Sequence, residues 1–203
     1  MATRRAAKRA QIADAARRLF LAQGYAATSM DAVTAAAGVS KQTLYTYFPT
    51  KLDLLSEVLA NALGQLELDQ AHPPRLTTAG DLREVLLGFG KGFTSTIMRP
   101  ESVALLRLVL GEVFHISELR DSFRVALPGR LLQMTADLLR AADARGIVPV
   151  AEPEMAARMF IGPLMTFVAL DGFLTGDGDA RPPSTEQLEF IVDAFLATLG
   201  VRR

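Results

Sequence analysis

Cysteine is absent from the 203 residues of this chain, and only two histidines are present. The missing thiols exclude disulfides, thiolate metal sites and cysteine nucleophiles. The sequence also lacks a glycine-rich phosphate loop, a GxSxG nucleophile elbow and an HExxH zinc motif. Gly88-Phe89-Gly90 lies inside a helical pattern, and Gly176-Asp177-Gly178-Asp179 lacks the glutamate spacing of a calcium loop. The sequence therefore predicts no enzyme, no cofactor and no metal site.

Long apolar runs and a signal peptide are also missing. The longest apolar run, Met159 to Leu170, is closed by Arg158 and Asp171 and falls short of the ~20 residues that a bilayer requires. The basic N-terminal residues lead into an amphipathic pattern and not into an apolar segment with a cleavage site. Half of all residues are hydrophobic, which is enough for a substantial core. We therefore expect a globular cytoplasmic protein, with no membrane partner, in which this run is a buried helix.

The net charge of the chain is zero, but its two ends differ strongly in charge. Residues 1–51 carry eight basic and two acidic side chains, a net charge of +6, so the remainder carries −6. A basic end of this kind is typical of a surface that meets a polyanion. A solvated basic face without a partner has the same composition, so charge alone leaves both interpretations open. The basic residues are Arg4, Arg5, Lys8, Arg9, Arg17, Arg18, Lys41 and Lys51.

Apolar periodicity and capping signals predict four helices in the first 66 residues. Gly24 ends the first, Gly38 forms a tight turn after the second, and Pro49 ends the third. Side chains expected to cap the later helices are Thr28 with Asp31, Ser40, and Thr50 with Asp53. The predicted ranges are Ala7 to Gln23, Met30 to Ala37, Lys41 to Phe48 and Lys51 to Leu66.

The rest of the chain is also predicted to be helical, with loops at Asp69 to Gly80 and Gly176 to Pro183. No strand-like alternation and no repeat of fixed period is present. We therefore predict an all-α fold of about nine helices, divided into residues 1–50 and residues 51–203. The later helices are predicted at Asp81 to Met98, Pro100 to Phe114, Glu118 to Arg145 with a break at Pro128-Gly129, Glu152 to Leu174 and Ser184 to Leu199.

The second and third predicted helices have the spacing of a helix-turn-helix, with Ala37-Gly38-Val39-Ser40 as the turn. In this motif the second helix enters the major groove of DNA, so one face must anchor it while the other reaches base edges. Val39, Leu44 and Phe48 have the spacing of the anchoring face. The side chains left to contact bases are Lys41, Gln42, Thr43 and Thr46.

Flanking side chains provide candidate contacts to the DNA backbone. Tyr45 and Tyr47 can donate their phenolic hydrogens to phosphates on either side of the groove. Lys51 and the free amides at the start of the fourth helix form a further candidate phosphate clamp. A protein-protein adaptor that uses the helical bundle without DNA is an alternative, although the basic end argues against it.

Several short motifs in the first 51 residues carry a family resemblance: Gly24-Tyr25, Thr28-Ser29-Met30, Ala36-Ala37-Gly38-Val39-Ser40, Thr43-Leu44-Tyr45, Tyr47-Phe48 and Lys51. With this order and spacing, residues 8 to 56 resemble the DNA-binding domain of the tetracycline-repressor (TetR) family. The resemblance implies that positions 41, 42, 43 and 46 read bases. It also implies that Thr28 holds phosphate together with Tyr45, Tyr47 and Lys51. Gln42 departs from many relatives, which carry glycine there, so a direct base contact is expected at this position.

The resemblance also implies that residues 60 to 203 form a helical domain that binds an inducer and dimerises through its last two long helices. The segment from Leu105 to Pro128 resembles a C-terminal class found in bacterial regulators of this family. The apolar residues of the last two helices suit a dimer bundle, although a single-chain core could also cover them. These residues are Met155, Met159, Ile161, Leu164, Met165, Val168, Leu170, Leu188, Ile191, Val192, Phe195 and Leu199.

A ligand pocket for a small apolar or aromatic effector is predicted within this second domain, because such pockets are mostly apolar. Each candidate residue could equally belong to the core. The predicted function is a ligand-responsive regulator, a homodimeric repressor that a small-molecule inducer releases from a palindromic operator in double-stranded DNA. The candidate pocket residues are Phe89, Phe93, Met98, Phe114, His115, Phe123, Met134, Phe160, Met165 and Phe167.

Overall fold

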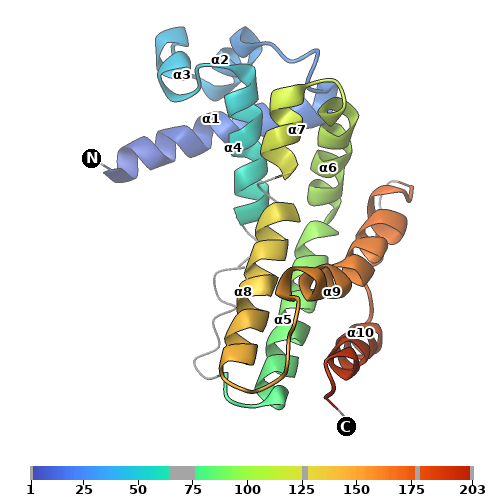
Figure 1. Cartoon of the computed structure of the whole chain (residues 1–203). Coiled ribbons are helices and arrows are strands. Elements are labelled where there is room, and N and C mark those ends of the chain that lie inside the picture. The colour runs from blue at the N-terminus through green and yellow to red at the C-terminus, as the bar shows by residue number, and fades with distance from the viewer. Residues whose placement is uncertain (1, 65–75, 125–127, 177–178, 202–203) are drawn as a thin grey trace. The chain divides into compact units, whose positions relative to one another are not determined.

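The computed structural model describes residues 2–64, 76–124, 128–176 and 179–201. These residues include ten α-helices and a π-helical segment at Val168–Phe173, and none of them is in a strand. The chain divides into two compact units (Figure 1). Unit 1 is Met1–Leu63 with Ala104–Phe123, and unit 2 is Gly64–Val103 with Arg124–Arg203. The predicted all-α fold is confirmed, whereas the predicted domain boundary at residue 50 remains a prediction.

Four helices begin unit 1, and their bounds agree with the predicted ranges to within a few residues. They are α1 (Ala2–Gln23), α2 (Met30–Ala37), α3 (Lys41–Tyr47) and α4 (Lys51–Gly64). The end of the predicted fourth helix, at residues 65 and 66, lies outside the described residues, as do residues 69–75 of the first predicted loop and 177–178 of the second.

Two of the three predicted caps are present. The Ser40 hydroxyl accepts a hydrogen bond from the Thr43 amide, 3.1 Å away, at the start of α3. At the start of α4, the Asp53 amide donates to the Thr50 hydroxyl at 3.0 Å and the Thr50 amide donates to the Asp53 carboxylate at 2.9 Å. These reciprocal bonds satisfy amides that have no partner within the helix.

The third predicted cap, Thr28 with Asp31, is wrong. Ser29 caps α2 instead, since its hydroxyl accepts from the Ala32 amide at 3.1 Å. The Thr28 side chain is only 1% exposed, and its hydroxyl donates to the Gly24 carbonyl at 2.8 Å. Thr28 therefore turns into the interior of unit 1 and closes the turn after α1.

The core of unit 1 joins α1–α4 to a segment from the middle of the chain. Helix α6 (Pro100–Val113) contributes Leu105 and Val109, and α7 (Ser117–Arg124) contributes Leu119. Phe20 and Phe48 are fully buried in the same core. The anchoring of the helix-turn-helix thus depends on residues more than fifty positions away.

In the described part of unit 2, four helices form a bundle: α5 (Ala79–Ile97), α8 (Arg130–Ala144), α9 (Pro153–Phe167) and α10 (Thr185–Thr198). Helix α9 continues as a π-helical segment at Val168–Phe173. Helix α8 packs against α9, and α5 packs against α10 and α9. Phe160 is central, with ring centroids 5.4 Å from Phe195 and 6.0 Å from Phe89. The Arg83 guanidinium, 2.6 Å from the Asp193 carboxylate, ties α5 to α10.

The stretch Pro153–Phe173 is long and apolar enough to cross a membrane by length and composition. These 21 residues form one continuous helical stretch, because Pro163 is accommodated inside α9. The stretch is longer than the apolar run from Met159 to Leu170 that the sequence shows. The core helix of a soluble protein meets the same test, so one such helix is weak evidence for a membrane span. Within unit 2 the stretch packs against α8 and α10.

Candidate nucleic-acid interface

Helix α3 has one buried face and one exposed polar face, as the sequence pattern predicts. Leu44 and Phe48 are fully buried, and Val39 is half-buried against the core of unit 1. Lys41, Gln42 and Thr46 are exposed, and Thr43 is half-buried. The exposed side chains offer an ammonium, an amide and a hydroxyl, which are groups that can hydrogen-bond to base edges in the major groove.

The turn between α2 and α3 depends on the backbone of Gly38. Its φ is +61°, in the left-handed region that side chains with a Cβ rarely adopt. The Gly38 amide donates to the Ala35 carbonyl and the Val39 amide to the Thr34 carbonyl, each at 3.2 Å. This pattern ends α2 and directs the chain into α3.

Gly38→Ala is therefore expected to lower the free energy of unfolding by about 1 kcal/mol. A Cβ at position 38 would meet no atom within 4 Å, so the cost comes from φ alone. Gly88 in α5 is the matched control, because it also has nothing within 4 Å but has helical φ, and Gly88→Ala is expected to raise the stability by roughly 0.5–1 kcal/mol. Urea denaturation followed by circular dichroism measures both. Effects of the same sign would contradict this account.

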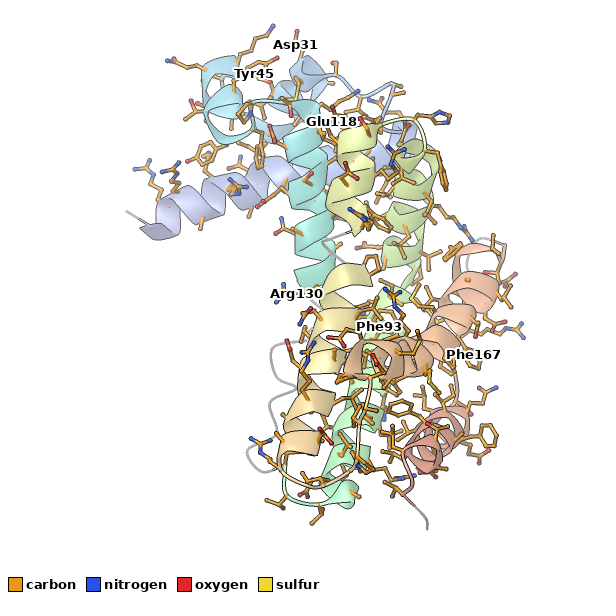
Figure 2. All side chains as sticks on the ribbon, viewed as in Figure 1. Asp31, Tyr45, Phe93, Glu118, Arg130 and Phe167 are labelled. Atoms are coloured by element: carbon orange, nitrogen blue, oxygen red, sulfur yellow. The ribbon has the colours of Figure 1, made fainter. Side chains whose placement is uncertain are left out.

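An ion pair holds the candidate base-reading residue Lys41 in the free protein. Its ammonium lies 2.8 Å from the carboxylate of Asp31 on α2, and both side chains are 65% exposed. The hydrogen bond to Asp31, reinforced by the charge of the carboxylate, raises the pKa of Lys41. Asp31 and Tyr45 lie on the neighbouring helices α2 and α3 (Figure 2). The carboxylate thus competes with DNA for the Lys41 charge.

Asp31→Asn is expected to tighten binding to all duplexes by roughly 3- to 10-fold at low salt, because it removes a carboxylate that repels the DNA and frees the Lys41 ammonium. Glu84→Gln, an exposed change of the same charge on α5, controls for net charge and is expected to change affinity little. Fluorescence anisotropy with a random duplex measures both. Equal affinities for the two variants would show that the ion pair does not limit DNA binding.

The four candidate phosphate-binding side chains are placed very differently. Tyr45, on α3, is 48% exposed. Tyr47 is half-buried, and the Arg5 guanidinium lies 5.9 Å from its ring centroid. Thr28 is buried, with its hydroxyl bonded to Gly24. Of these four side chains, only that of Tyr45 is exposed, and their contacts with phosphate remain predictions.

The half-buried Lys51 side chain is engaged with the protein backbone in the free protein. Its ammonium donates to the carbonyls of Tyr25, Ala26 and Thr28, at 2.8, 3.2 and 3.0 Å. It also lies 4.3 Å from the centroid of the Tyr25 ring. An ammonium has three donors, and all three are used here. Lys51 thereby fastens the start of α4 to the turn between α1 and α2, a role that its sequence position does not reveal.

Unit 2 contains a cavity of about 380 Å³ between α5 and α8. Its walls are mostly apolar, and the exceptions are Thr135, Asp137 and Arg145. The spacing of the lining residues along each helix is also that of an ordinary core face, so the sequence could not separate them from the core. The lining residues are Leu76, Val85, Leu86, Phe89, Met134, Thr135, Asp137, Leu138, Ala141 and Arg145.

Two of the ten residues predicted for the pocket, Phe89 and Met134, line this cavity. The others that belong to unit 2 are buried or half-buried in the bundle: Phe93, Met98, Phe160, Met165 and Phe167, of which Phe93 and Phe167 are labelled in Figure 2. The remaining three, Phe114, His115 and Phe123, belong to unit 1. Phe114 is 76% exposed, and His115 is also exposed, so neither lines an enclosed space.

Exposed apolar side chains lie on α9, the π-helical segment and α10. About half of the apolar residues predicted for a dimer bundle, including Ile161, Leu164 and Val192, are buried in the core of unit 2 itself. Three of the predicted residues, Met155, Met159 and Leu170, are exposed, and so are Leu174 and Phe190. Phe190 is 75% exposed, which is unusual for so large an apolar side chain. We call these five residues the apolar face.

Two protein families match this chain, one at each end. Residues 12–58 match the family described as bacterial regulatory proteins, tetR family, and residues 84–200 match the AefR-like transcriptional repressor, C-terminal domain. The HTH-type transcriptional regulator SrpR of Pseudomonas putida is 28% identical over 174 residues, which are 85% of this chain and 78% of SrpR.

Solved structures extend the similarity to nearly the whole chain. The flavonoid-responsive regulator FrrA is 29% identical, with a TM-score of 0.74 over 96% of this chain and 95% of FrrA. A TetR family transcriptional regulator from Pseudomonas syringae pv. tomato is 26% identical, with a TM-score of 0.67 over 94% of each chain.

Proposed function

Since the chain belongs to the TetR family of bacterial transcriptional regulators, we propose that it is a homodimeric repressor that a small apolar or aromatic molecule releases from a palindromic operator. The chain is a DNA-binding regulator and not an enzyme. The observation that carries the proposal is the exposed polar face of α3. The opposite face anchors the helix through the fully buried side chains of Leu44 and Phe48. We further propose that the protein acts in the cytoplasm, where its operator lies.

The apolar face of α9 and α10 supports the homodimer. A second copy of the chain can cover these side chains, which water otherwise surrounds. A dimer also has a functional reason, because two recognition helices about one DNA turn apart read two half-sites at once. The two-fold symmetry of such a dimer is what makes a palindromic operator the expected target.

The cavity between α5 and α8 supports a small effector. A volume of about 380 Å³ lies within the usual range of ligand pockets, and apolar walls favour an apolar or aromatic molecule. The related regulator FrrA is flavonoid-responsive, which agrees with a ligand of this class. Arg145 provides a cation at the cavity that can orient polar substituents, and Asp137, which is paired with Arg140, also lines it.

Release from DNA requires only that the effector prefer the conformation with low DNA affinity. A differential binding free energy of about 2–3 kcal/mol corresponds to a change of roughly 30- to 150-fold in operator affinity. By the same linkage, operator DNA must weaken effector binding by the same factor.

Selection of genomic fragments with the purified protein tests the proposal. We expect enrichment of a short palindromic site, bound at nanomolar strength with a steep dependence on salt. Adding apolar aromatic compounds, with a flavonoid as the first probe, is expected to displace the labelled site. Recovery of no common sequence by folded, dimeric protein would contradict the proposed function.

A further inference from the structure

The first three turns of α1 are strongly basic, and their local structure leaves much of this charge unneutralised. No acidic residue precedes Asp14, whereas Arg4, Arg5, Lys8 and Arg9 all lie before it. Arg9 is bound to Glu57, with guanidinium and carboxylate 2.7 Å apart. Lys8 donates to the neutral side chain of Gln11 at 3.0 Å.

Among the described residues, no carboxylate lies within ion-pair distance of the side chains of Arg4, Arg5 or Lys8. Arg4 and Arg5 are exposed, and Lys8 is half-buried. Arg4 and Lys8 are four residues apart, so they share one side of the helix and lie about 6 Å apart along its axis. We call these three residues the basic turn.

Two contacts place this part of α1 beside the C-terminal end of α3. The Arg5 guanidinium lies 5.9 Å from the ring centroid of Tyr47, and that of Arg9 lies 4.8 Å from the ring centroid of Phe48. Tyr47 is the last residue of α3, and Phe48 is its C-cap. The basic turn therefore lies next to the helix that carries the base-reading side chains, within the same compact unit.

A recognition helix in the major groove is flanked on both sides by sugar-phosphate strands, and duplex DNA carries about one phosphate charge per 1.7 Å of its axis. Cations beside one end of that helix lie where these strands pass. Flexible arginine and lysine side chains without carboxylate partners can follow the phosphates without reading any base.

We propose that Arg4, Arg5 and Lys8 form a second, sequence-independent DNA-binding surface that grips the phosphates flanking each half-site. This inference rests on the proposed function, because it requires α3 to occupy the major groove. It extends the DNA contacts of each protomer beyond the helix-turn-helix, onto a part of the chain that precedes the matched family region at residues 12–58.

The test compares wild-type protein with the triple variant Arg4→Gln, Arg5→Gln, Lys8→Gln, using anisotropy titrations of the selected operator and of a scrambled duplex at several salt concentrations. The triple variant is expected to lose at least about tenfold in affinity for both duplexes. A plot of log affinity against log salt concentration is expected to become less steep. Each lost phosphate contact reduces the slope by about 0.9, so the three substitutions reduce it by about 2–3 for each occupied half-site.

Three further variants make the result specific. Arg18→Gln removes a cation of α1 that is already paired with Asp14, and it is expected to leave the salt slope nearly unchanged. Arg5→Lys keeps the charge and is expected to bind like wild type. The double variant Arg4→Gln, Lys8→Gln preserves the contact between Arg5 and Tyr47, so it tests the charge even if the triple variant is unstable.

If the triple and double variants bind both duplexes like wild type, with an unchanged salt slope, the basic turn does not bind DNA. The proposed function would still stand. A loss confined to the operator, with the scrambled duplex unaffected, would also overturn it, because it would indicate base reading. If the wild-type protein binds neither duplex, the proposed function and this inference fail together.

Discussion

Phe190→Glu is expected to convert the protein to a monomer and to weaken operator binding by at least about 100-fold, because avidity across two half-sites is lost. Phe190 is 75% exposed on α10, so a carboxylate there is solvated in the monomer and costs little stability. In a dimer that buries the apolar face, the same carboxylate would be desolvated against apolar side chains, which is strongly unfavourable.

Phe114→Glu is a closely matched control. Phe114 is 76% exposed, so the two substitutions change chemically equivalent side chains, but Phe114 does not belong to the apolar face. Sedimentation equilibrium is expected to show a dimer for wild type and Phe114→Glu and a monomer for Phe190→Glu. A Phe190→Glu variant that remains dimeric would show that α10 does not form the subunit interface.

Lys51→Met is expected to destabilise unit 1 by about 3 kcal/mol, because three backbone carbonyls lose a charged donor. Two of the three hydrogen bonds are partly buried, so water replaces the ammonium only in part. The chain has three tyrosines and no tryptophan, and Tyr25, Tyr45 and Tyr47 all belong to unit 1. Tyrosine fluorescence during urea denaturation therefore reports on unit 1 alone.

Lys91→Met, at an exposed position of α5, is the control and is expected to change stability by less than about 0.5 kcal/mol. The DNA affinity of folded Lys51→Met at low temperature separates the two roles considered for this residue. If Lys51 is a phosphate ligand, the variant loses affinity and salt dependence while its unfolding curve stays the same as that of Lys91→Met. That combination would contradict the structural role derived from its hydrogen bonds.

Local signals in the sequence were sufficient to predict the helices around the helix-turn-helix. Gly38, Ser40 and the Thr50–Asp53 pair act within a few residues of their own positions, and the structure places each as the sequence predicts. Thr28 and Ser29 show the limit of such signals, because both are hydroxyl residues ahead of the same helix. Burial of Thr28 decides between them, and burial depends on the packing of unit 1.

Features that depend on distant residues could not be predicted from the sequence. Lys51 binds carbonyls 23 to 26 residues before it, and carbonyls have no sequence signature. Leu105 and Leu119 complete the core of unit 1 from the middle of the chain. The cavity residues Val85 and Leu138 have the same spacing as core residues, so only the three-dimensional packing shows which apolar side chains line a space.

The most direct test of the central claim, that α3 reads DNA through its exposed face, is the ranking of operator variants by the Gln42→Ala protein. Anisotropy titrations of the selected operator and of all its single-base variants are compared for wild type and Gln42→Ala. We predict that Gln42→Ala loses discrimination at one base pair of each half-site, by about 1–3 kcal/mol, while the ranking elsewhere is retained. An unchanged ranking at every position, for Gln42→Ala and likewise for Lys41→Ala and Thr46→Ala, would contradict the claim.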